Sequence, residues 1–65
     1  MKRYAVCFLS YSTGTPLVIS ETDSAAEAYQ GALKAEKEGI RGVRVADIPN
    51  STSHEPEVFK TMHRL

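Results

Sequence analysis

The stretch YAVCFLSY, residues 4–11, is apolar at almost every position. Successive side chains of a β-strand point to opposite faces of a sheet, so a strand with one face in water alternates apolar and polar residues. This stretch carries apolar groups on both faces, with Tyr4, Val6 and Phe8 on one side and Ala5, Cys7, Leu9 and Tyr11 on the other. The pattern predicts a central strand that needs cover on both faces.

The chain has 65 residues, which predicts one domain with a marginal hydrophobic core. Domains this small usually gain stability from disulfides, a metal ion, oligomerisation or very tight packing. Cys7 is the only cysteine, so no disulfide can form within the chain, and His54 and His63 lack the paired spacing of zinc ligands. We therefore expect no metal and no cofactor, but self-association, tight packing or a permanent partner.

Positive and negative charges balance, with eight Lys and Arg residues against eight Asp and Glu residues. Such a balance gives no global attraction to nucleic acid or to a membrane, and it does little to oppose self-association. No apolar run is long enough to span a bilayer. The apolar stretch after Lys2 and Arg3 is broken by Ser10, Ser12 and Thr13, unlike a secretory signal. We expect a cytoplasmic protein.

Two strands are predicted near the N-terminus. Residues 3–11 are rich in aromatic and β-branched residues, and residues 17–19, LVI, form a second apolar segment after the turn cluster STGTP at 12–16. Pro16 cannot donate a hydrogen bond to a neighbouring strand, which favours an edge position for the second strand. The two segments are expected to form a hairpin.

A helix is predicted from about residue 24 to about residue 38. The segment SAAE at 24–27 matches a capping box, and Gly39 followed by Ile40 fits a Schellman-type stop. Gly31 weakens the helix and, lying off the apolar stripe, has no evident packing role. The stripe expected to face the sheet is mostly alanine and comprises Ala25, Ala26, Tyr29, Ala32 and Leu33.

Residues 41–48 predict a third strand, which Pro49 ends. A right-handed crossover through the helix makes it parallel to the second strand and antiparallel to the first. The expected fold is α+β: a small three-stranded antiparallel sheet, ββαβ, with strand order 2-1-3 and one main helix on one face. Residues 1–49 form this core.

Residues 50–65 are expected to add a polar loop and a short amphipathic helix. Residues 50–55, NSTSHE, are polar, and Ser53 or Glu55 can cap a helix with Pro56 in its first turn. One face of that helix carries Val58, Phe59, Met62 and Leu65, and the opposite face carries Lys60, His63 and Arg64.

The second face of the sheet has three candidate covers. The C-terminal helix can fold back over it, a second copy of the chain can pack sheet against sheet or exchange its C-terminal helix, or a different protein can occupy it. An apolar face left uncovered marks an interaction site on a soluble protein.

The order of strand, strand, helix and strand resembles the antitoxin domains of HicB type. Asp23, Ser24, Glu27 and Ala28 at the helix start carry this resemblance. The Pro-Gly-Cys segment that precedes the helix in that family is absent here. The resemblance therefore does not assign the chain to the family.

No constellation of residues typical of catalysis is present in the sequence. Cys7 lies within an apolar strand, where a thiol behaves as a small buried apolar group. His54 belongs to a polar loop, and His63 is expected to complement the dipole of the last helix. The turn STGT lacks the spacing and the lysine of a phosphate-binding loop. We expect no enzymatic activity.

The composition favours a protein-interaction or regulatory module of the kind that bacteria and phages encode. It is expected to self-associate, as a homodimer, through the second sheet face or the C-terminal helix. The residues expected to contact the partner are of types common in interface cores, with two basic residues at the rim. They are Phe8, Tyr11, Phe59, Met62 and Leu65, rimmed by Lys60 and Arg64.

A nucleic-acid-binding regulator is the alternative. It would use the basic residues of the C-terminal helix, Lys60 and Arg64, together with Arg41 and Arg44 of the third strand. Exposed aromatic residues of the sheet can stack on bases in such proteins. The balanced charge and the absence of an RNA-binding or helix-turn-helix pattern count against it.

Overall fold

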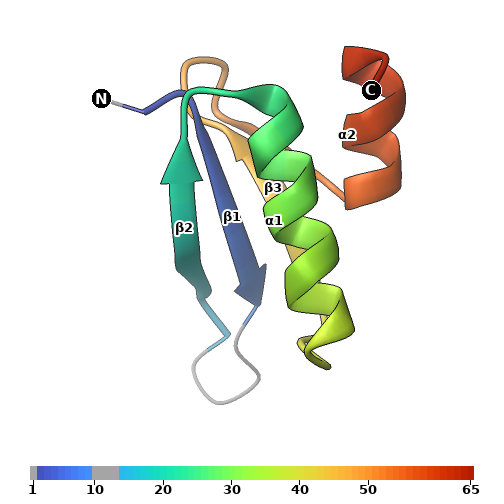
Figure 1. Cartoon of the computed structure of the whole chain (residues 1–65). Coiled ribbons are helices and arrows are strands. Elements are labelled where there is room, and N and C mark those ends of the chain that lie inside the picture. The colour runs from blue at the N-terminus through green and yellow to red at the C-terminus, as the bar shows by residue number, and fades with distance from the viewer. Residues whose placement is uncertain (1, 10–13) are drawn as a thin grey trace.

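The computed structural model describes residues 2–9 and 14–65, and within them it has four strands and two helices. Figure 1 labels β1, β2, β3 and both helices. Tyr11 and part of the predicted turn at 12–16 lie outside these residues. The elements are β1 (Tyr4–Leu9), β2 (Pro16–Thr22), α1 (Ala25–Lys37), β3 (Val43–Asp47), β4 (Thr52–His54) and α2 (Pro56–His63).

The sheet is antiparallel throughout, with the order β2-β1-β3-β4. The predicted α+β class and the antiparallel pairing of β1 with β3 are confirmed, and β1 is central as its two apolar faces indicated. The prediction of three strands in the order 2-1-3 is wrong, because β4 adds a fourth strand beside β3.

The fourth strand forms where the sequence predicted only a polar loop. A tight turn over residues 48–51 reverses the chain, with Ser51 at φ 54° and its amide donating to the carbonyl of Ile48 at 3.2 Å. The Asn50 side chain holds the turn by donating to a carboxylate oxygen of Asp47 at 2.9 Å. Pro49 therefore sits inside a hairpin turn and does not end the sheet.

The ends of α1 follow the predicted signals with one change. Ser24 Oγ accepts from the amide of Glu27 at 3.3 Å, but the carboxylate of Glu27 accepts from the hydroxyl of Thr22 at 2.8 Å. That hydroxyl also accepts from the amide of Ser24 at 3.1 Å, so Thr22 mediates the second half of the capping box. At the other end Gly39 has φ 91° and the Ile40 amide donates to the Ala35 carbonyl, which confirms the Schellman stop.

A stripe of alanines lets α1 lie close to the sheet. Ala28, Ala32 and Ala35 are buried with Tyr29, whereas Ala26 is exposed and Leu33 is only partly buried, so the buried face is rotated from the predicted one. The approach is close enough that a Cβ at Gly31 would lie 3.3 Å from Cγ2 of Val6. This contact is the packing reason for Gly31 that the sequence pattern did not reveal.

The second helix lies on the same face of the sheet as the first (Figure 1). Phe59 is fully buried, and its ring meets that of Tyr4 edge-on at 5.5 Å between centroids. The His63 ring lies 4.2 Å from Phe59 and 5.5 Å from Tyr4. The expectation that His63 faces away from Phe59 is therefore wrong, and α2 does not cover the second face.

Each helix lies within the described part of the chain, and neither is long and apolar enough to cross a lipid bilayer.

Gly31→Val should destabilise the protein because its Cβ alone would lie 3.3 Å from Cγ2 of Val6, a side chain that is only 1% exposed, and its γ carbons add further volume. Overpacking of this kind costs about 1–3 kcal/mol. Urea unfolding should show a net loss relative to wild type, although replacement of a glycine within a helix by itself favours the helix. An unfolding free energy equal to or above that of wild type would contradict the close approach.

Arg64→Gly should stabilise the protein. Arg64 follows α2 in the left-handed region at φ 55°, which is unfavourable for any residue with a Cβ. Removal of that strain should raise the free energy of unfolding by about 1 kcal/mol. Arg64→Ala is the matched control, since it removes the same side chain and retains the strain; a gain of the same size from alanine would show that the side chain, not the backbone, is responsible.

Candidate functional site

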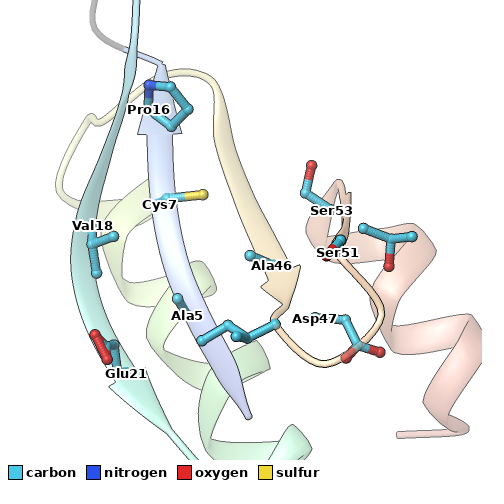
Figure 2. Close-up of a pocket in the computed structure, with 11 residues that line it drawn as sticks. Ala5, Cys7, Pro16, Val18, Glu21, Ala46, Asp47, Ser51 and Ser53 are labelled. Atoms are coloured by element: carbon cyan, nitrogen blue, oxygen red, sulfur yellow. The ribbon is translucent and has the colours of Figure 1, made fainter. Parts of the chain in front are cut away.

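The face of the sheet opposite α1 and α2, here called the open face, carries a shallow apolar depression of about 390 Å³. Its floor is formed by three small residues of the two central strands, Ala5 and Cys7 of β1 and Ala46 of β3 (Figure 2). Around them stand residues of β2, of the end of β3, of the β3–β4 turn and of β4: Pro16, Val18, Glu21, Asp47, Ile48, Ser51, Thr52 and Ser53.

Ala5 and Cys7 of the floor have little solvent exposure, although no helix of the described residues covers them. Ala5 is 5% and Cys7 8% exposed because these short side chains lie between flanking strands. The rim is much more accessible, with Val18 at 60% exposed. A low apolar floor beside a taller apolar rim is a surface on which a second protein layer can approach closely.

A register shift between β1 and β2 determines which β2 residue lies beside Cys7. Val6 pairs with Ser20 of β2, but the next residue, Cys7, pairs with Val18, so one extra residue is accommodated in β2 at this point. Such a β-bulge re-aims the side chains on either side of it. Here it leaves Val18 on the open face next to Cys7.

Two opposite charges flank the floor on different sides of β1. Glu21 of β2 pairs with Ala5, and Arg44 of β3 pairs with Cys7, so each projects on the open face. The Arg44 guanidinium donates to Oγ and to the carbonyl of Ser53, at 3.2 and 2.9 Å. Among residues 2–9 and 14–65 the structure has one ion pair, Lys2 with Asp23, so neither Glu21 nor Arg44 has a partner of opposite charge there.

The thiol of Cys7 is poorly suited to nucleophilic chemistry. Burial raises the pKa of the Cys7 thiol, and the nearby positive charge of Arg44 opposes this rise only in part. The Sγ atom lies 3.6 Å from the carbonyl oxygen of Arg44. His63, a possible base, packs on the opposite face of the sheet, so the two are not brought together. The described residues contain no group of three or more His, Cys, Asp or Glu that could hold a metal.

The residues predicted to contact a partner are separated in the structure. Phe59 is in the core and Phe8 packs partly against it, on the helix-covered face. Tyr11 lies outside the described residues. Met62 of α2 and Leu65, which follows the helix, are exposed, at 55% and 42%.

The two basic rim residues are exposed as expected. The Lys60 ammonium lies 5.8 Å from the centre of the Tyr29 ring, and Arg64 ends α2. Arg44, which the nucleic-acid hypothesis groups with them, lies on the opposite face of the sheet. The structure therefore does not gather these cations into one basic surface.

The sequence predicted that a second sheet face could be an interaction surface, but it did not identify which side of β1 forms that face, although a signal was present. In YAVCFL the side that carries Tyr4, Val6 and Phe8 is bulky, whereas the other carries Ala5 and Cys7. Large side chains fill the space under a helix layer, so the size difference between the two sides indicated which face the helices cover.

No protein-family model matches the chain, and no curated protein or solved structure is detectably similar to it.

The Cys7 thiol should make stability fall at alkaline pH. Because the folded state raises the pKa of Cys7, its contribution to the unfolding free energy is complete below the pKa of an unfolded thiol, about 8.5, and is lost as pH rises above it. Urea unfolding of wild type and Cys7→Ala at neutral and alkaline pH measures this. The wild type should lose more stability than the variant; parallel losses would show that the thiol is not desolvated.

Proposed function

We propose that this chain is a small, non-enzymatic protein-interaction module that binds its partner through the open face of the sheet. The uncovered apolar floor and rim carry the proposal. Both helices pack on one side, which leaves the other side of the two central strands without a layer in the described residues. Uncovered apolar surface of this kind on a small domain favours a role in association.

The open face is a better candidate than α2, the other surface that the sequence favoured. The largest apolar side chain of α2, Phe59, is buried in the core. The exposed Val58 and Met62 stand on a helix of eight residues, and Leu65 lies just beyond its end. A helix this short is held by its packing and is a less rigid platform than a sheet. The floor residues of the open face, by contrast, belong to strands paired on both sides.

The charged rim adds selectivity to this surface. Glu21 and Arg44 stand at its two sides and are not neutralised by any ion pair of the described residues. Charges at the rim of an interface steer the approach and select the orientation of a partner, while the apolar centre supplies most of the affinity. A partner should therefore be apolar at its centre and carry charges complementary to these two.

Site-specific photocrosslinking in cells of the native host tests the surface and does not require that the partner be identified first. With p-benzoylphenylalanine in place of Val18, which is 60% exposed on the rim, irradiation should give a discrete protein adduct. The adduct should be lost when Ala46→Asp is added, since a carboxylate on the floor opposes burial of that face.

The matched controls carry the same photoreactive residue at Met62 on α2 and at Gln30 on α1, which are both exposed on the helical side. These positions should give no adduct, or none that Ala46→Asp removes. A discrete adduct from Met62 with none from Val18 would contradict the proposal and favour α2. Circular dichroism of each variant confirms that it is folded.

A further inference from the structure

We propose that the partner of the open face is a second copy of this chain, packed face to face about a twofold axis that runs along β1. In this arrangement Arg44 of each copy lies opposite Glu21 of the other. This inference rests on the proposed function and specifies the partner.

The positions of the two charges within the sheet point to this axis. Glu21 lies on β2 beside Ala5, and Arg44 lies on β3 beside Cys7, so the two flank β1 on opposite sides. A twofold axis along β1 exchanges these sides, which places the Arg44 of one copy above the β2 strand of the other. The remaining offset, two residues along a strand, is about 7 Å. The long side chains of arginine and glutamate can bridge it.

The other face-to-face arrangement brings like charges together. A twofold axis that crosses the strands leaves Arg44 on the β3 side, so it would approach the Arg44 of the second copy, and Glu21 would approach Glu21. Like charges placed opposite each other at an interface are strongly unfavourable. The charge pattern therefore discriminates between the two packings and selects the axis along β1.

The centre of the open face suits a self-complementary contact. Ala5 and Cys7 lie on the axis and would meet their own copies, and small side chains there permit close approach. Val18 pairs with Cys7, and Cys7 pairs on its other side with Arg44, so the axis sets Val18 over Arg44 of the second copy. The aliphatic part of the Arg44 side chain can pack against Val18 there while its charged end reaches toward Glu21.

Two further properties reduce the free-energy cost of forming this dimer. The chain has a formal net charge of zero, so two copies do not repel each other. The Arg44 side chain is already held by two hydrogen bonds to Ser53, and its remaining N–H donors are uncommitted among the described residues. A guanidinium fixed in advance loses less freedom when it pairs with a carboxylate.

Charge reversal of purified protein, followed by light scattering over a range of concentrations, tests the axis. The wild type should have twice the mass of one chain. Arg44→Glu and Glu21→Arg should each weaken the dimer at least ~10-fold, because each homodimer then holds two like-charged contacts. An equimolar mixture of the two variants should form the dimer again, since every contact in the mixed pair is of opposite charge.

An axis across the strands would also pair opposite charges in the mixture, so the mixture tests the charge contact itself. The weakening of each single variant relative to wild type tests the axis, because with the other axis wild type would already hold like-charged contacts. Lys60→Glu on α2 is the matched reversal away from the open face and should leave the dimer unchanged. Arg44→Lys retains the charge while it alters the contacts to Ser53, and it should also dimerise.

Three outcomes would overturn the proposal: a wild type that is monomeric throughout, a dimer that neither reversal weakens, or a mixture that does not restore it. A monomer in solution whose Val18 position still crosslinks to another protein in cells would refute the second copy as partner and leave the proposed function standing. A dimer that Lys60→Glu disrupts would refute both, because it would place the interface on α2.

Discussion

The burial of Phe59 is the interaction on which the arrangement of this small protein depends. Its ring packs edge-on against Tyr4 of the central strand and face-tilted against His63 one turn further along α2. This cluster is continuous with Val6 and Val45 and with the alanines of α1, so both helices share one core. In 65 residues a single shared core buries more apolar area per residue than two thin ones would.

The second face of the sheet is open because the first takes both helices. Its floor of Ala5, Cys7 and Ala46 is apolar and is flanked by a carboxylate and a guanidinium. The bulky side chains of β1 therefore face the core under the helices, and its small side chains face the side that is available for association.

Local rules predicted the parts of the fold that depend on neighbours in sequence. The central position of β1, the Ser24 cap and the stop at Gly39 follow from alternation and capping chemistry. The fourth strand was missed because a turn in the left-handed region at Ser51, a residue without the signature of glycine, reverses the chain after Pro49. Gly31 was unexplained because its role is a contact with a strand 25 positions away in sequence.

The side on which α2 docks also could not be read from periodicity. An eight-residue helix offers two alternative stripes, and apolarity favoured Val58, Met62 and Leu65, whereas the ring of His63 packs with Phe59 and leaves those three exposed. The side of α2 that packs its rings against Tyr4 is buried, although the other side carries more aliphatic residues. The candidate site shifted with this choice, because the predicted contact residue Phe59 became core and the opposite face became free.

Proton NMR measures the central claim, that α2 packs beside α1 and leaves the second face open. Nuclear Overhauser effects from the Phe59 ring should connect it to the Tyr4 ring and to the methyl groups of Val45. They should be absent between Phe59 and the methyl groups of Ala5 and Ala46, which lie on the open face. Contacts from Phe59 to those two alanines would show that α2 covers the second face and would contradict the account.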